Sequence, residues 1–157
     1  MNDLTIESVE SESDAMELDT RLWEVLWRPL GLPRNVRESF KLEGESVKFV
    51  AKSHGEVLGG LVANRTSPTE VKLRHIALKP EAQNKGAGSR LVNALIGTIS
   101  QNKCTQIRVI ARDTSTGFFR KLGFTTSPGE APEHPAFKKH RITFELMEKN
   151  FESVRGL

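Results

Sequence analysis

Two closely spaced glycines end the segment Gln83-Asn84-Lys85-Gly86-Ala87-Gly88, and a long stretch of helical periodicity follows them. Glycine lets the backbone approach a ligand closely and adopt conformations that other residues avoid. The first turn of a helix leaves its N–H groups unpaired, and with the helix dipole they attract an anion such as a phosphate. The segment is therefore a candidate phosphate-binding loop, and a simple helix-entry turn is the alternative.

Two familiar phosphate-binding motifs do not fit this loop. A Walker loop needs Gly-x-x-x-x-Gly-Lys-Ser/Thr, which the chain lacks. A dinucleotide fingerprint needs three glycines directly after a strand, whereas here the first glycine lies 10 residues past Ile76 and the third is missing.

The elements that must position the loop follow from hydrophobic periodicity. Apolar residues recur at helical spacing from Gly88 to Asn102, and Glu70 to Leu78 has the pattern of a strand that Pro80 ends. Further strands are expected at residues 4–9, 47–51, 57–65, 106–111, from 124 on, and at 141–148, and further helices from Ser13 to before Pro29, at 35–42 and at 115–122. Strands paired by hairpins, followed by strands linked through helices, predict an α/β (α+β mixed) sheet in one domain over residues 1–157.

Three local patterns add detail to these elements. Gly59 and Gly60 inside a strand indicate a bulge or close backbone packing. Strict alternation would place Val71, Leu73, His75 and Ala77 on one apolar face. Trp23 and Trp27, at helical spacing, indicate core or a pocket wall.

Two blocks of the sequence together resemble a known family. Leu73–Leu91, LRHIALKPEAQNKGAGSRL, closely resembles the core motif of the GNAT superfamily of acetyl-CoA-dependent N-acetyltransferases. That motif is a strand ending in an aliphatic residue, then x-Pro, then Gln/Arg-x-x-Gly-x-Gly/Ala at a helix start. Ala111–Phe124 resembles the later family motif, a short helix ending in aromatic-Tyr-x-x-x-Gly-Phe. The blocks stand in the right order and about the right distance apart.

The resemblance implies a fold and a set of site residues. The fold is a mixed, mostly antiparallel sheet of about six or seven strands, flanked by about four helices and splayed at a cofactor cleft. The main chain of Ile76, Ala77 and Leu78 would bind the pantetheine arm of acetyl-CoA as an added strand, and the Leu78 N–H would hold the reaction's oxyanion. The other residues implied at the cofactor are Gln83, Lys85, Gly86, Ala87, Gly88, Ser89, Phe118 and Phe119, with a place in the core as the alternative for the last two.

The resemblance leaves the proton-transfer groups open. The family often has a tyrosine at the position of Phe119 to protonate the departing thiolate, but this chain contains no tyrosine. The thiolate either leaves unassisted or takes a proton from another donor or water, a weaker requirement than for a poorer leaving group. The base for the amine has two candidates: His75, whose ordinary pKa lies near neutrality, or Glu70 acting through water. A histidine packed against the sheet is the alternative for His75.

Two arginines and the overall composition limit the kinds of partner that this protein can have. Arg74 and Arg112 could contact an acidic acceptor or cofactor phosphates, or form salt bridges. The net charge of +3 is spread along the chain, unlike the dense basic stripe of a nucleic-acid protein. No apolar run reaches the ~20 residues of a membrane span. One cysteine excludes an internal disulfide and a multi-cysteine metal site, so we expect no metal and a cytoplasmic location.

Two functions remain at this stage. The first is an N-acetyltransferase that moves an acetyl group from acetyl-CoA to a primary amine of a small molecule or peptide, by direct attack in a ternary complex. The second is a non-catalytic acyl-CoA-binding or sensing module on the same fold. An exposed edge strand at residues 141–148 could support a homodimer.

Overall fold

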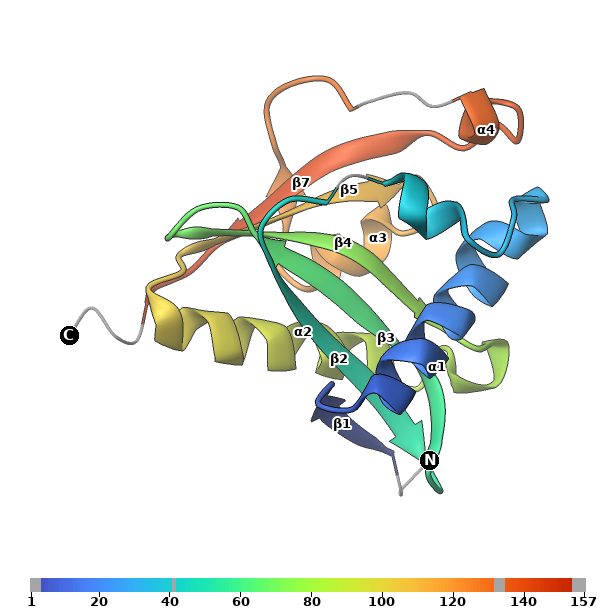
Figure 1. The fold of residues 1–157 in the computed structure, drawn as a ribbon. Helices are drawn as coiled ribbons and strands as arrows, with labels where there is room; N and C mark the ends of the chain where they lie inside the picture. The colour runs from blue at the N-terminus through green and yellow to red at the C-terminus, as the bar shows by residue number, and fades with distance from the viewer. Residues whose placement is uncertain (1–3, 41, 132–134, 154–157) are drawn as a thin grey trace.

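A computed structural model describes residues 4–40, 42–131 and 135–153 of the chain. Within these ranges a seven-stranded sheet has the order β1-β2-β3-β4-β5-β7-β6 (Figure 1). Every neighbouring pair is antiparallel except β4 and β5. The strands are β1 Thr5–Ser8, β2 Glu45–Ser53, β3 Glu56–Arg65, β4 Glu70–Leu78, β5 Gln106–Arg112, β6 Thr125–Thr126 and β7 Phe144–Asn150. The predicted mixed, mostly antiparallel sheet is confirmed.

Helices cover both faces of this sheet, as Figure 1 shows. The α-helices are α1 Glu12–Leu22, α2 Ala87–Ile99, α3 Thr116–Lys121 and α4 Pro135–Lys138. Ser11 caps α1, because its hydroxyl accepts a hydrogen bond from the Asp14 N–H at 3.0 Å. The shorter helical segments are η1 Trp23–Trp27 with π-helical geometry and the 3₁₀ turns η2 Arg28–Leu30, η3 Val36–Ser39, η4 Pro80–Ala82 and η5 Ser100–Asn102. The helix predicted at 35–42 is thus a single short turn, and α4 was not predicted.

The sheet separates two apolar clusters. The cluster on the α2 face includes Leu73, Leu91, Val109 and Phe119. The cluster on the opposite face, the α1 face, includes Leu18, Trp27, Val62 and Ala77. The face that a side chain occupies therefore decides which helices it meets.

Gly60 brings α1 into direct contact with the β3 backbone. A Cβ at this position would overlap the Phe49 carbonyl oxygen and lie 2.8 Å from Leu18 Cδ1. Gly59, next to it, adjoins a register shift between Ala51 and Lys52 of β2. The expected bulge and close packing are both present.

A second bulge, in β4, overturns the predicted alternation. Val62 pairs with His75 and Ala63 pairs with Leu73, which leaves Arg74 as an extra residue on β4. The alternation is shifted by one position there, so Leu73 faces α2 while His75 packs with Trp27 on the α1 face. The prediction that Leu73 and His75 share a face was wrong, because the bulge depends on strand pairing.

The strand predicted as an exposed edge is covered in part by a short outer strand. β7 lies between β5 and β6, and the Ser127 N–H donates to the Leu146 carbonyl at 2.8 Å beyond β6. The outer strands of the described sheet are β1 and the two-residue β6. The edge predicted at residues 141–148 is therefore covered at residues 146–148, while Phe144 and Glu145 have no strand partner on that side among the described residues. The homodimer stays a prediction.

Candidate functional site

The two central strands separate in the middle of the sheet. β4 and β5 pair only from Glu70 with Gln106 to Leu73 with Val109, and both strands then continue without pairing to each other. We call the opening between residues 74–78 of β4 and 110–112 of β5 the seam. An extended ligand can enter a sheet at such a place by hydrogen bonding to the exposed strand.

Alternate main-chain groups of β4 face the seam. The Lys79 N–H donates to the Leu58 carbonyl of β3 at 2.8 Å. Because main-chain groups alternate along an antiparallel strand, Ala77 also directs its amide at β3, whereas Ile76 and Leu78 direct theirs at the seam. The Leu78 carbonyl accepts from Gln83 Nε2 at 2.8 Å, consistent with this direction. Two of the three predicted main-chain contacts, Ile76 and Leu78, are thus available at the seam.

The loop after β4 turns through left-handed backbone into α2. Asn84 has φ of +60° and Gly86 has φ of +81°, and Gly86 is the N-cap residue of α2. No side chain caps this helix, so its first N–H groups remain open to a ligand. Gln83, Lys85 and Gly86 are exposed, and the side chain of Ala87 is buried. The structure thus brings together the predicted loop residues at one helix N-terminus.

Gly88 and Phe118 pack against each other in the first turn of α2. A Cβ at Gly88 would lie 3.1 Å from the Phe118 ring. Phe119 is 2% exposed and its ring lies 5.1 Å from that of Phe124, centroid to centroid. Phe118 therefore borders the loop, while Phe119 belongs to the core and contributes a ring without a hydroxyl.

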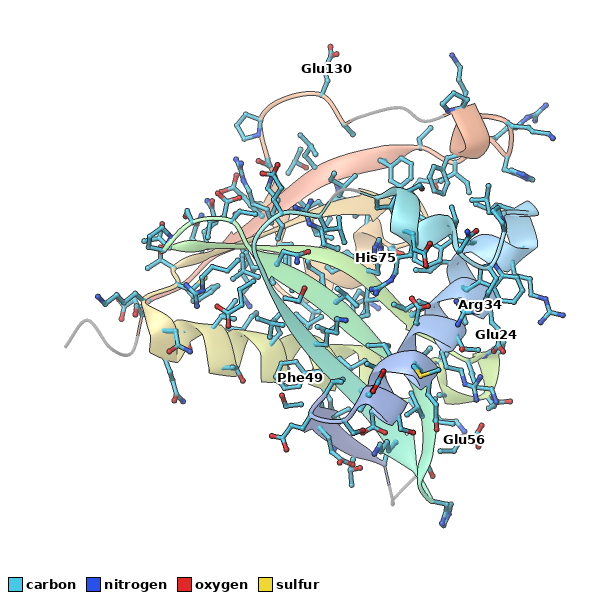
Figure 2. All side chains as sticks on the ribbon, in the orientation of Figure 1. Glu24, Arg34, Phe49, Glu56, His75 and Glu130 are labelled. Carbon is cyan, nitrogen blue, oxygen red and sulfur yellow. The ribbon has the colours of Figure 1, made fainter. Side chains whose placement is uncertain are left out.

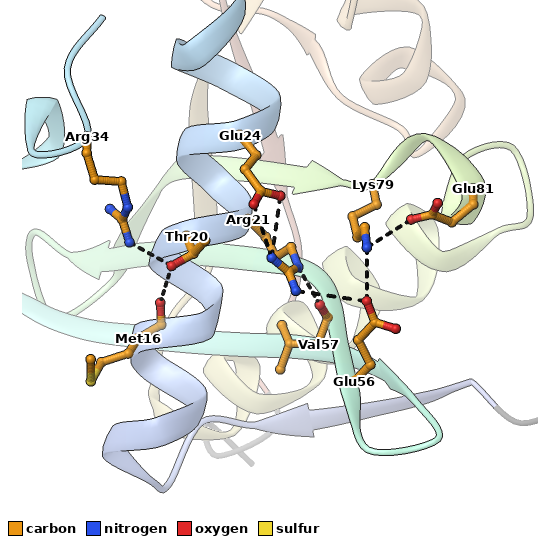
Figure 3. A network of polar contacts seen from close by, with 9 residues as sticks. All are labelled: Met16, Thr20, Arg21, Glu24, Arg34, Glu56, Val57, Lys79 and Glu81. Atoms are coloured by element: carbon orange, nitrogen blue, oxygen red, sulfur yellow. Dashed lines mark hydrogen bonds and ion pairs between the residues drawn. The ribbon is translucent and has the colours of Figure 1, made fainter.

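A polar network ties the base of this loop to α1 (Figure 3). Lys79 pairs with Glu56 at 2.9 Å and with Glu81 at 3.2 Å. Hydrogen bonds to these two carboxylates raise the pKa of Lys79. On the other side, Arg21 Nε donates to the Val57 carbonyl at 2.9 Å. Each exposed ion pair is weak alone, but together they connect α1, the β2–β3 turn and the entrance of the loop.

A cavity of about 340 Å³ runs along the seam. Residues of both sheet faces line it, Phe119 and Leu73 from the α2 face and Trp27 and Phe40 from the α1 face. It therefore passes between β4 and β5. Its full lining is Leu26, Trp27, Phe40, Leu42, Leu73, Arg74, His75, Ile76, Val109, Ile110, Ala111, Arg112, Ser115, Phe119, Phe137 and Phe144.

His75 lies in this cavity on the α1 side of the sheet (Figure 2). The Trp27 ring meets its imidazole edge-on at 4.9 Å between centroids, and the Phe40 ring lies at 5.7 Å. Its Nε2 is buried and has no hydrogen-bond partner among the residues that the structure describes. An unpartnered buried nitrogen is costly, so it marks a place where a bound molecule would supply the partner.

The charge state of His75 follows from its surroundings. Burial, and to a smaller extent the positive charges of Arg37, Arg74 and Arg112, lowers the pKa of His75 to about 3, and the charge of Asp19 opposes them. The imidazole is therefore neutral at pH 7. A group with so low a pKa is a poor base toward an ammonium ion, but it still offers hydrogen bonds.

Glu70 lies away from the seam. It begins β4, eight residues before Leu78, which corresponds to about 26 Å along an extended strand. Its carboxylate lies 3.9 Å from Arg108 Nη1. The structure therefore brings His75, but not Glu70, to the place where β4 and β5 separate.

The aromatic walls of the cavity were only partly foreseen. Trp27 is buried and lines the cavity, while the Trp23 indole N–H donates to the Leu32 carbonyl at 3.0 Å. Their spacing had indicated either core or a pocket wall. Phe40 lies in the segment predicted as a helix at residues 35–42, and Phe137 lies beyond the predicted loop, but neither residue was predicted to line a pocket. No group of three or more His, Cys, Asp or Glu side chains in the described part of the chain could hold a metal ion. No helix there is long and apolar enough to cross a membrane.

Comparisons with known proteins agree with this geometry. A family model described as "Acetyltransferase (GNAT) domain" matches residues 24–151. A putative N-acetyltransferase from Lactobacillus plantarum superposes with a TM-score of 0.76 at 16% identity, over 94% of this chain and 98% of that one. The ribosomal-protein-S18-alanine N-acetyltransferase of Escherichia coli gives 0.72 at 18% identity, over 95% and 94%. An aminoglycoside 6'-N-acetyltransferase complexed with coenzyme A gives 0.73 at 16% identity, over 93% and 96%.

Proposed function

This chain belongs to the GNAT acetyltransferase family, and on that premise we propose that it is an N-acetyltransferase using acetyl-CoA as donor and a primary amine as acceptor. The observation that carries the proposal is the cavity that passes through the sheet at the seam. A donor on the α2 side and an acceptor on the α1 side can meet there. Both substrates bound at once need no covalent enzyme intermediate.

The main-chain N–H groups of Ile76 and Leu78 face the seam and have no partner on another strand of the described sheet. The N–H of Ile76 would bind the pantetheine arm, and the N–H of Leu78 would bind the thioester oxygen as it becomes an oxyanion. The pyrophosphate would lie at the first turn of α2, against Gly86 and Gly88, with the exposed Lys85 and the half-buried Ser89 beside it. A structural neighbour complexed with coenzyme A supports the choice of acetyl-CoA as donor.

The reaction itself is a direct displacement. The amine nitrogen attacks the thioester carbonyl carbon, the tetrahedral intermediate collapses, and the C–S bond breaks with its electron pair on sulfur. Neutral His75 would accept a hydrogen bond from the amine and orient it, since its low pKa makes it a weak proton acceptor. The proton would pass to water, and the thiolate would take a proton from water because Phe119 offers none.

A second function is favoured by two of these residues. Phe119 supplies no hydroxyl, and His75 is a weak base. Both would suit a module that binds acyl-CoA without turning it over.

The test separates the two functions in two steps. Isothermal titration calorimetry with acetyl-CoA measures binding, and a thiol reagent then follows coenzyme A release with a panel of primary amines. We expect binding, and amine-dependent release for at least one amine. Binding with no release for any amine would support the non-catalytic module, and absence of binding would refute both.

A further inference from the structure

Two arginines in the cavity indicate the chemical class of the acceptor, an inference that rests on the proposed function. Arg74, on the β4 bulge, and Arg112, at the end of β5, both line the cavity. Both side chains lie on the α1 face, because Arg74 contacts Asn64 there and Arg112 contacts Leu26 and Phe137. The predicted pyrophosphate loop leads into α2 on the other face. The two cations thus lie on the acceptor side.

Arg112 is a half-buried cation beside an aromatic ring. Its Nη2 donates to the Leu26 carbonyl at 2.9 Å, and its Cζ lies 5.3 Å from the centre of the Phe137 ring. It forms no ion pair with any carboxylate of the described residues, and Asp113 acts on it only through its charge. Since a guanidinium carries five N–H donors, most of its hydrogen-bonding capacity remains for a ligand.

Arg74 is similar and is held in position. Its Nε donates to Asn64 Oδ1 at 3.3 Å, and Asn64 is itself 1% exposed and bonded to Ser46 Oγ at 3.1 Å. Its two terminal nitrogens form no hydrogen bond or ion pair with the described residues, while Glu43 and Glu70 act on it through their charges. The bulge therefore presents an oriented but unneutralised guanidinium.

A third arginine near His75 provides a contrast. Arg37 acts on His75 through its charge, but its Nε pairs with Asp19 at 2.7 Å. The protein thus neutralises one of the three cations around His75 and leaves two without a carboxylate. Both guanidinium groups are half-buried. Partial burial of a charge without a counter-charge is unfavourable, and an anionic ligand would supply the counter-charge.

We propose that the acceptor is an amine that carries a carboxylate on an apolar body, as an apolar α-amino acid does, and that Arg74 and Arg112 bind this carboxylate. The rings of Trp27, Phe40 and Phe137 would surround the apolar body. His75 Nε2 would meet the amine, which would then lie between the two arginines and the seam.

The test uses pairs of amines that differ only in the carboxylate: L-phenylalanine with 2-phenylethylamine, and L-leucine with 3-methylbutylamine. Coenzyme A release from acetyl-CoA gives kcat/KM for each. For at least one pair, we expect kcat/KM of the carboxylate-bearing amine to exceed that of its partner by about 10- to 100-fold, which corresponds to one hydrogen bond to a charged group. The ratio is kcat/KM for the carboxylate-bearing amine divided by kcat/KM for its carboxylate-free partner. When this ratio is compared across variants, the intrinsic reactivity of each amine cancels.

The variants Arg74→Gln and Arg112→Gln should reduce the ratio toward one, because they should lower kcat/KM more for the carboxylate-bearing amine than for its carboxylate-free partner. Arg112→Lys, which keeps the charge, should restore part of it. The control is Arg120→Gln, because Arg120 pairs with Glu145 at 2.6 Å outside the cavity lining, and its ratio should match the wild type. Thermal unfolding of each variant checks that it is folded.

Four outcomes would contradict the inference or the function on which it rests. Equal or faster turnover of the carboxylate-free amines, or a ratio unchanged in both glutamine variants, would refute it and leave the proposed function standing. A preference for succinyl-CoA over acetyl-CoA that disappears in Arg112→Gln would assign the arginines to the donor instead. Absence of turnover with every amine, while acetyl-CoA still binds, would refute the proposed function itself.

Discussion

Replacing Gly86 by glutamate tests whether the loop before α2 holds the pyrophosphate. An added Cβ at Gly86 meets no atom within 4 Å, so the new side chain would extend into open space at the helix N-terminus. The backbone there has φ of +81°, where an L-residue costs roughly 1–2 kcal/mol. For a chain of this size that lowers Tm by about 2–8 °C. Gly86→Glu should therefore remain folded.

The effect on binding follows from charge. A carboxylate about 6 Å from one phosphate charge is repelled by about 0.7 kcal/mol in water and about 3 kcal/mol at an effective dielectric constant of 20. Two phosphate charges double these values, so acetyl-CoA affinity should fall by roughly 10-fold to 10,000-fold. Gly86→Gln is the matched control, since it has the same backbone strain and nearly the same size without the charge.

Calorimetric titration with acetyl-CoA at low and high salt measures the difference between the two variants. Gly86→Glu should bind much more weakly than Gly86→Gln, and salt should narrow the gap because it screens the repulsion. An affinity for acetyl-CoA that matches the wild type in Gly86→Glu would refute the placement of the pyrophosphate at this loop. Equal losses of acetyl-CoA affinity in both variants would show that the size of the new side chain causes the effect, and would contradict the electrostatic reasoning.

The remaining predictions concern packing and pH. Gly88→Val should cost about 1–3 kcal/mol of unfolding free energy by overpacking against Phe118, and a double-mutant cycle with Phe118→Ala should show a smaller loss. Gly60→Ala should cost about as much in urea denaturation, whereas Gly97→Ala, with open space around its Cβ and a helical backbone, should gain up to about 1 kcal/mol. The pKa of His75 is lowered to about 3, so below pH 6.5 the unfolded state binds more protons than the native state. The free energy of unfolding should therefore fall as the pH drops from 6.5, with a slope that approaches about 1.4 kcal/mol per pH unit. His75→Phe should flatten this slope between pH 6 and 5, and an unchanged slope would show that His75 is not the group responsible.

Parts of the fold with strong local signals were predictable. The alternation of side chains along residues 70–78, together with Pro80 after them, predicted β4, and its observed bounds Glu70–Leu78 match that prediction. Helical periodicity after two glycines located α2, and the paired hairpin strands gave the antiparallel part of the sheet. These elements are determined by residues close together in the sequence, so the sequence pattern alone was sufficient.

Other parts depend on contacts between distant residues. The β4 bulge exists because Val62 and Ala63 pair with His75 and Leu73 across the hairpin, and no pattern within β4 marks it. The prediction of the sheet face on which the His75 side chain lies was wrong for that reason. The cavity wall at Phe137 depends on α4, a four-residue helix beside a proline-rich loop, which is too short to show periodicity.

The β4 bulge also has a consequence for how the cavity can be altered. Deleting Arg74 would join Leu73 directly to His75 and restore regular antiparallel pairing with Ala63 and Val62. Every other side chain of β4 would keep its face, so the imidazole and the seam would stay in place while one cation disappeared. Deletion of this single codon would therefore change the charge of the cavity without shifting the strand register, which makes this position a point where substrate preference can change independently of the fold.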